Sequence, residues 1–152
     1  MKGVLHIINK FNEFINTIPL WFFILLILVI RFMDILTAYI WYICSPESFL
    51  KHEGNEVAVR VFYYGEWHEI TQLIVPFIVV VFIIVILGYL TKSTIHKYIL
   101  FGYSVFGISA ILCNICSIFT SSILFLHIIS TPLDILSIFI LILGLYFNLK
   151  GG

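Results

Sequence analysis

Residues 20–43 read LWFFILLILVIRFMDILTAYIWYI, which is hydrocarbon throughout except for Arg31 and Asp34. At a rise of about 1.5 Å per residue, a helix of this length spans about 36 Å, enough to cross a bilayer with some tilt. Each central charge costs about 2.5–3.5 kcal/mol on insertion scales, whereas each Leu, Ile, Phe or Val contributes only about 0.3–0.6 kcal/mol in favour of insertion. The stretch therefore predicts a membrane-spanning helix whose two charges face protein or water instead of lipid.

The composition of the whole chain agrees with this interpretation. Of 152 residues, 62% are hydrophobic and 11% are charged, whereas a soluble domain carries about 25% charged residues. Eight basic and eight acidic side chains cancel, so nothing points to nucleic acid as a partner. The sequence has no glycine-rich phosphate loop that would indicate a nucleotide site. We expect an all-α protein with one transmembrane domain over residues 1–152.

The hydrophobic pattern predicts an integral membrane four-helix bundle preceded by a short amphipathic helix. In residues 4–18 the apolar side chains fall within an arc of about 120° at helical spacing, which indicates a helix in the membrane interface or against the bundle. Pro19 separates this helix from the first span. The expected spans are residues 20–43, 70–90, 98–120 and 123–147, the last interrupted at Thr131–Pro132. In the extracytoplasmic loop, residues 44–69, the order Ser45-Pro46-Glu47 is typical of a helix start.

The distribution of Lys and Arg predicts the orientation. The spans place Lys51 and Arg60 on one side, and five lysines on the other: Lys2, Lys10, Lys92, Lys97 and Lys150. By the positive-inside rule, both termini are then cytoplasmic and the acidic loop lies outside, in a multi-pass protein of the cell membrane.

Polar side chains occur at matching depths in three of the four spans. In the first span they share a face at a spacing of three residues, and in the fourth they share one at spacings of four and three. We predict an outward-facing intramembrane polar site made by Arg31, Asp34, Thr37, Asn114, His127, Thr131 and Asp134. The residues expected at its mouth are Glu53, Asn55 and Glu56.

This polar layer has three interpretations. Arg31 can form a buried ion pair with Asp34, Asp134 or both that only fixes helix register, while His127 and Asn114 hydrogen-bond across helices. Alternatively, the carboxylate, hydroxyl and amide oxygens suit a hard cation, or a transition metal if His127 joins them. The third interpretation is a proton relay, because ionisable residues inside a membrane mark pathways or binding sites.

The leading hypothesis is a small transporter, channel-like or sensor module that holds a cation or proton. Whether the protein is an enzyme is left open at this point, and a non-enzymatic role is favoured. The alternative is a membrane thiol-disulfide oxidoreductase that uses the C-x-x-C pair Cys113 and Cys116. Such enzymes need a second cysteine pair, and only Cys44 remains. A third hypothesis is a structural subunit of a membrane complex. The expected partners are the lipid bilayer, a cation, and other membrane proteins or further copies of the chain. The sequence identifies no cofactor.

Short motifs around the first loop resemble a known family. The sequence has Asp34-Ile35-Leu36-Thr37, then Glu53-Gly54-Asn55, then Arg60 and Gly65 before the second span. This pattern is similar to the D-x-x-T … E-x-N-P signature of small bacterial and archaeal four-helix membrane proteins of unknown function. The likeness covers residues 31–90, and Glu56 stands where the family has proline. The resemblance implies that Asp34, Thr37, Glu53 and Asn55 share one polar site.

Overall fold

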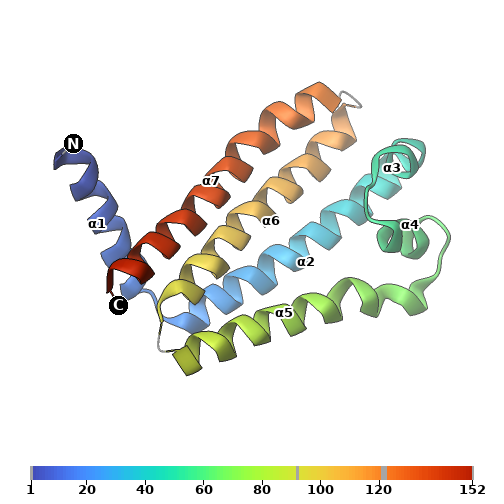
Figure 1. Ribbon diagram of the computed structural model, residues 1–152. Helices are drawn as coiled ribbons and strands as arrows, with labels where there is room; N and C mark the ends of the chain where they lie inside the picture. The colour runs from blue at the N-terminus through green and yellow to red at the C-terminus, as the bar shows by residue number, and fades with distance from the viewer. Residues whose placement is uncertain (1, 92, 121–122, 152) are drawn as a thin grey trace.

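The computed structural model describes residues 2–91, 93–120 and 123–151, and in these ranges the chain is helical with no strand, which confirms the predicted fold class (Figure 1). Four helices are long and apolar enough to cross a membrane, as predicted. They are α2 (Leu20–Cys44), α5 (Ile70–Thr91), α6 (Ile95–Phe119) and α7 (Ile123–Gly151). The shorter helices are α1 (Lys2–Thr17), α3 (Pro46–His52), α4 (Glu56–Phe62) and the 3-10 helix η1 (Trp67–Glu69).

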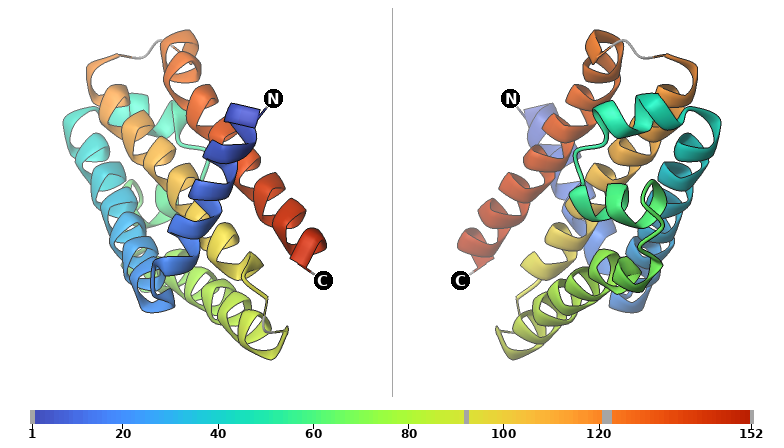
Figure 2. Two further views of the ribbon diagram at one scale, coloured as in Figure 1. Left: turned by 90° about the vertical axis from the view of Figure 1, so that its left-hand side faces the viewer. Right: turned by 90° about the vertical axis from the view of Figure 1, so that its right-hand side faces the viewer.

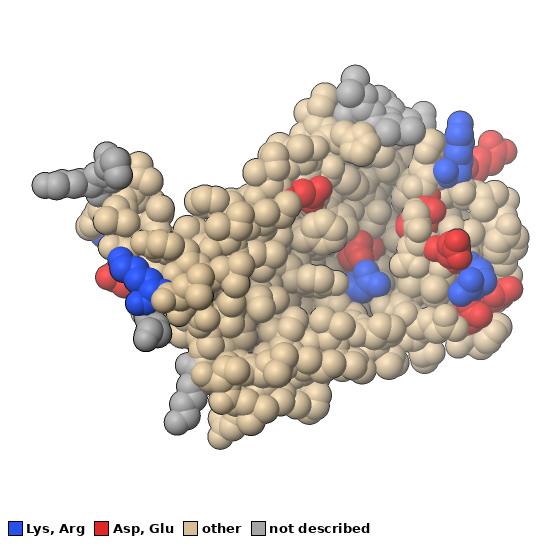
Figure 3. Space-filling view, in the orientation of Figure 1, with Lys and Arg blue, Asp and Glu red and all other residues tan. Residues whose placement is uncertain are grey.

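Helix α6 lies in the middle of the bundle. It packs most extensively against α7 on one side and α2 on the other, and α5 lies at the edge (Figures 1 and 2). Both ends of the chain lie near one end of the long helices, here called the terminal end. The other end, here called the loop end, carries α3 and α4. Charged side chains gather at these two ends, and the middle part is mostly uncharged (Figure 3).

Two hydrophobic clusters hold the helices together. The larger joins α1, α2, α5, α6 and α7 through fully buried Ile15, Phe23, Tyr98 and Leu100 and their neighbours. The smaller lies at the loop end, where Phe49 of α3 packs edge-on against Trp41 of α2 with ring centroids 5.3 Å apart. This cluster ties α3 and α4 to α2, so the connection between the first two long helices is folded onto the bundle.

The amphipathic helix α1 lies against the terminal end and runs across the long helices (Figure 2). The last carbonyls of a helix have no partner within that helix, and here Lys97 satisfies one of them together with the carbonyl of the residue just after the helix. Its ammonium group donates to the carbonyls of Asn16 at 2.9 Å and Ile18 at 2.7 Å. The hydroxyl of Tyr98 donates to the side-chain oxygen of Asn12 at 2.5 Å. The first residues of α6 therefore hold α1 on the bundle.

Local sequence signals account for the ends of α3 and α4. As predicted, α3 begins with Pro46 directly after Ser45, because proline suits a first helical position, where its missing N–H is no loss. After α4 the chain reverses at Gly65, whose φ of +74° lies in the left-handed region that favours glycine. These turns bring η1 back to the start of α5.

Helix α7 continues through Pro132, so the interruption predicted at Thr131–Pro132 is wrong. A proline inside a helix removes one backbone hydrogen bond, which usually breaks a soluble helix. A membrane helix keeps its path because neighbouring helices and small local adjustments re-satisfy the freed carbonyl.

The contact between α6 and α7 depends on a glycine, and we expect Gly144→Ala to destabilise the fold by about 1–3 kcal/mol, as overpacking does. A Cβ atom at Gly144 would lie 2.5 Å from the Cβ of Tyr98, whose side chain is fully buried. Thermal unfolding in detergent measures the loss. Gly3→Ala is the control, since nothing lies within 4 Å of a Cβ there. Equal unfolding temperatures for Gly144→Ala and wild type would contradict the prediction.

Candidate functional site

The polar site is centred on α2. Arg31 and Asp34 lie three residues apart on one helix face, and a guanidinium nitrogen of Arg31 forms an ion pair with a carboxylate oxygen of Asp34. The side chains are 26% and 18% exposed. The other terminal nitrogen of Arg31 donates to the backbone carbonyl of Leu73 on α5 at 3.0 Å. The charged pair thus links α2 to α5.

Pro76 favours the link to α5. Its nitrogen carries no hydrogen, so the carbonyl of Gln72 four residues earlier loses its helical donor. The carbonyl of Leu73 lies in the same loosened turn, where a side-chain donor has access to it. The Arg31 guanidinium carbon also lies 5.9 Å from the centroid of the Phe77 ring, one turn further along α5. The cation is therefore held between a carboxylate, a carbonyl and an aromatic face.

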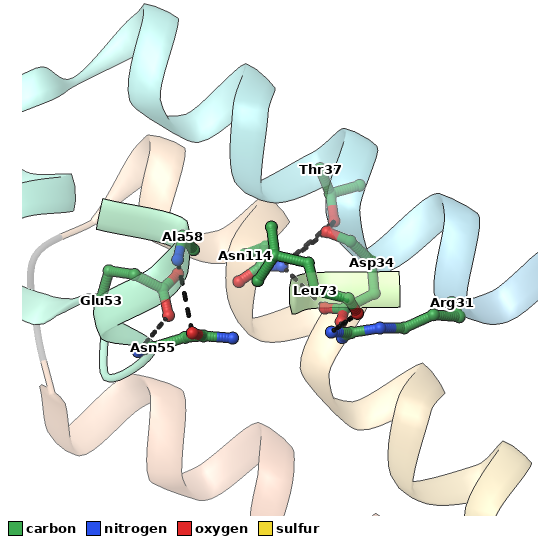
Figure 4. Close-up of polar contacts among 8 residues, drawn as sticks. All are labelled: Arg31, Asp34, Thr37, Glu53, Asn55, Ala58, Leu73 and Asn114. Atoms are coloured by element: carbon green, nitrogen blue, oxygen red, sulfur yellow. Dashed lines mark hydrogen bonds and ion pairs between the residues drawn. The ribbon is translucent and has the colours of Figure 1, made fainter. Parts of the chain in front are cut away.

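Asn114 brings α6 into the site. Its amide nitrogen lies within hydrogen-bonding distance of three acceptors on α2: the backbone carbonyl of Asp34 at 3.2 Å, its carboxylate at 3.1 Å and the Thr37 hydroxyl at 3.2 Å. The Thr37 hydroxyl in turn donates to the Asp34 carbonyl at 3.0 Å. In Figure 4 the amide of Asn114 lies between Asp34 on one side and Glu53 and Asn55 on the other. Asn114 therefore fixes the carboxylate from the side opposite to Arg31.

The loop between α3 and α4 supplies the other wall. Asn55 is the N-cap of α4, and its side-chain oxygen accepts from the backbone nitrogens of Val57 at 3.1 Å and Ala58 at 3.3 Å. The carboxylate of Glu53 accepts from the backbone nitrogen of Asn55 at 2.8 Å. These bonds fold the loop into a compact turn that holds Glu53 partly buried at the site.

Burial raises the pKa of the Glu53 carboxyl above its ordinary value. The negative charge of Asp34 raises this pKa further, while the hydrogen bond from Asn55 and the positive charge of Arg31 lower it. The net shift is upward. Glu53 is therefore electrostatically coupled to the ion pair on α2.

Together these residues line one cavity of about 270 Å³, here called the carboxylate cavity. Its polar lining comes from Arg31, Asp34, Glu53, Asn55 and Asn114, and the rest is mostly apolar. The middle part of the molecule is otherwise mostly uncharged, and a hollow that contains acidic and basic side chains is visible there (Figure 3). With both carboxyl groups ionised, the lining carries one negative charge in excess. Such a site attracts one positive charge, either a proton or a monovalent cation.

Most of the predicted residues from the first span and the loop thus come together. Thr37 is buried behind the cavity as an acceptor for Asn114. Glu56 does not line the cavity. It is exposed in the first turn of α4, and its charge acts on Arg60. Among the described residues, no group of three or more His, Cys, Asp and Glu side chains is arranged to hold a metal ion.

The residues predicted on the fourth span do not join this cavity. His127 and Thr131 are exposed and line a separate open pocket of about 480 Å³ on α7. Asp134 is half-buried, and one of its carboxylate oxygens is buried with no hydrogen-bond partner among the described residues. Helix α6 packs between α2 and α7, so side chains at matching depths on these two helices stay apart (Figure 1).

All three cysteines are free thiols. Cys44 is exposed, and Cys113 and Cys116 are half-buried on successive turns of α6. Cys113 lies near Ser130 and Asp134 of α7, on the other side of α6 from the carboxylate cavity. The oxidoreductase hypothesis therefore concerns a different place in the fold from the cation hypothesis.

Sequence reasoning missed three groups that the structure places in or along the polar interior: the Leu73 carbonyl, Tyr103 and His96. The Leu73 carbonyl is a backbone group, and only Pro76 three residues later hints at its accessibility. Tyr103 lines a smaller cavity next to the ion pair, and in the sequence it is one aromatic residue among many. His96 reads as an interfacial side chain, but the structure packs it against α5 with its Nδ1 atom buried.

Comparisons with known proteins add no family to this description. The chain matches no protein-family model, no curated protein and no solved structure. The resemblance to the D-x-x-T … E-x-N-P proteins accordingly stays a prediction. The assignment of function depends on the geometry of the carboxylate cavity.

Proposed function

We propose that the protein is a multi-pass membrane protein that binds a proton at the carboxylate cavity, with the loop end outside the cell. The orientation follows from the positive-inside rule. Lys2 and Lys10 lie in α1, Lys97 lies at the start of α6, and Lys150 lies at the end of α7, and these elements meet at the terminal end. Of the Lys and Arg residues that the structure describes, only Lys51 and Arg60 lie at the loop end. The terminal end is then cytoplasmic, and the other predicted lysine, Lys92, lies outside the described residues.

The observation that carries the proposal is the position of Glu53. Glu53 is partly buried, and its side chain lines the same cavity as Asp34 and Arg31, whose charges act on it. Arg31 neutralises one of the two carboxylates, and the other remains uncompensated in a partly apolar cavity. Uncompensated buried charge is costly, so the site favours uptake of a proton. Because burial raises the Glu53 pKa, this carboxyl is the group that takes it up.

The proposal predicts that the protein becomes less stable as pH rises. The folded state, with its raised Glu53 pKa, binds this proton more tightly than the unfolded state does. The resulting stabilisation is complete below the ordinary pKa of 4.5 and is lost as pH rises through the higher folded-state pKa. Thermal unfolding in detergent from about pH 4.5 to about pH 8 measures the slope. Glu53→Gln is neutral throughout and is expected to remove this component of the slope.

Glu56→Gln is the matched control, because Glu56 is three residues away, exposed, and outside the cavity lining. It is expected to keep the wild-type slope. If Glu53→Gln keeps that slope as well, Glu53 is not the proton-binding group. Repeating the series in Na⁺, K⁺ and a bulky organic cation at equal ionic strength identifies the ligand. A stabilisation specific to Na⁺ or K⁺ at high pH, lost in Asp34→Asn, would assign the site to that cation instead.

A further inference from the structure

Three cavities follow one another along the seam between α2, α5 and α6. The carboxylate cavity at the loop end is the first. The second, here called the middle cavity, measures about 60 Å³ and adjoins Ile27, Arg31, Asp34, Phe77 and Tyr103. The third opens at the terminal end beside Leu20, Gly88 and His96 and measures about 530 Å³. It is here called the His96 pocket. Along each helix the lining residues progress in this order from the loop end to the terminal end.

A single face of α6 contributes to all three cavities. Asn114 lines the carboxylate cavity, Gly107 and Tyr103 the middle cavity, and His96 the His96 pocket, while Ala110 borders the first two. The intervals of four, three, four and seven residues place these positions within a narrow stripe at about 100° per residue. Gly107 has no side chain, and a Cβ atom there would lie 2.4 Å from Ile30. The stripe therefore faces the seam over the whole length of the helix.

Two barriers interrupt the seam. The Arg31–Asp34 ion pair borders both the carboxylate cavity and the middle cavity, so it lies at the junction of the two. Between the middle cavity and the His96 pocket, buried apolar side chains of α2 and α5 fill the space, among them Phe23 and Val81. This plug extends over seven residue steps, from Ile27 to Leu20, or about 10 Å along α2.

His96 occupies the terminal end of the seam in an unusual way. The side chain packs directly on Gly88 of α5, where a Cβ atom would lie 2.3 Å from the imidazole ring. Its Nδ1 atom is buried, and the backbone of Ser93 lies within hydrogen-bonding reach of the imidazole. The charged group that acts on it is Lys97. An imidazole that lines the pocket at the terminal end and packs on α5 fits a group that gives and accepts protons.

Helix α5 is the element that can open the plug. Of its 22 residues only Leu73, Phe77, Val81 and Gly88 are buried. Pro76 weakens the helix just where the Leu73 carbonyl holds Arg31. A tilt of α5 about this point would part the plug without breaking the contacts of α6 with α2 and α7.

We propose that the seam between α2, α5 and α6 is a transmembrane proton path, with Glu53 and Asp34 at its outer end and His96 at its inner end. This inference rests on the proposed function. Glu53 takes a proton from outside water and passes it to Asp34, and water and the Tyr103 hydroxyl carry it along the middle cavity. When the plug parts, the proton reaches His96, which releases it to cytoplasmic water. The structure shows the closed state.

The test is proton uptake by liposomes of zwitterionic phosphatidylcholine that contain the purified protein and a trapped pH-sensitive dye. A K⁺ gradient with valinomycin drives protons inward, and protein-free liposomes give the baseline. We expect wild-type flux above this baseline, and a decrease toward the baseline in Glu53→Gln and in His96→Gln. Val81→Ala shortens the plug and is expected to raise the flux, which a variant that merely folds poorly would not do.

Matched controls distinguish the seam from the rest of the molecule. His127→Gln changes an exposed histidine on α7, and Val80→Ala changes an exposed neighbour of Val81. Both are expected to keep wild-type flux. Flux that falls equally in His127→Gln and His96→Gln, or rises equally in Val80→Ala and Val81→Ala, would overturn the path. So would wild-type flux no higher than the baseline while Glu53 still produces its pH-dependent stability, and in that case the proton-binding function stands without transport.

Discussion

Asp34→Ala is expected to lower the free energy of unfolding by about 3 kcal/mol, the lower end of the cost of breaking a buried pair, because both side chains keep some exposure. The variant removes the carboxylate that pairs with the Arg31 guanidinium and leaves the Leu73 carbonyl and the Phe77 ring beside it, while Glu53 acts on it only through its charge. It also removes the carboxylate acceptor of Asn114. Chemical or thermal unfolding in detergent at neutral pH measures the loss.

The double variant Arg31→Met/Asp34→Leu separates the cost of an unpaired charge from the worth of the pair. Replacing both partners by apolar residues is often neutral or stabilising, so the double variant should recover most of the stability lost in Asp34→Ala. Glu69→Ala breaks a more exposed ion pair, in which the Nε atom of Arg60 lies 2.5 Å from a carboxylate oxygen of Glu69. This variant should lose much less stability than Asp34→Ala. If Asp34→Ala costs no more than Glu69→Ala, the ion pair on α2 is effectively solvated.

Tyr98→Ala is expected to cost about 3–5 kcal/mol, as large-to-small changes at buried aromatic positions do. The side chain is fully buried where three helices meet. Its ring lies edge-on to Phe11 of α1 at 6.3 Å and stacks on Phe147 of α7 at 6.3 Å. Removing the ring leaves a cavity and releases α1 from the bundle. Unfolding in detergent measures the first effect, and faster protease cleavage within α1 reports the second.

Tyr98→Phe keeps the ring and removes only the hydrogen bond to Asn12, so its cost should be about 1 kcal/mol. Tyr103→Phe is a second control, since this side chain is exposed and not part of the buried core. A Tyr98→Ala variant as stable as Tyr98→Phe would mean that the helices close the cavity by moving together. It would also mean that α1 is held mainly by Lys97.

The pairing inside α2 could be predicted from local spacing. Arg31 and Asp34 are three residues apart on a helix whose length follows from continuous hydrophobicity, so their contact needs no information about the fold. The helix start at Pro46 is equally local. The approach of Glu53 to the ion pair is not local, because it depends on how α3 and α4 pack through Phe49 on Trp41 and bring the loop back over α2. Short motifs placed Asp34 and Glu53 in one site, but hydrophobicity and periodicity did not.

The sequence by itself determined the four long helices and the amphipathic helix before them, because hydrophobic length and helical periodicity are properties of single segments. Tertiary structure alone decided which polar side chains meet. The sequence correctly predicted that Asp34 and His127 lie on helices long enough to span a membrane, α2 and α7. Helix α6 packs between these two helices and keeps the two side chains apart. Which helix occupies the middle depends on close contacts such as Tyr98 on Gly144 and Ile30 on Gly107. Such contacts join residues far apart in the chain, and no single segment encodes them.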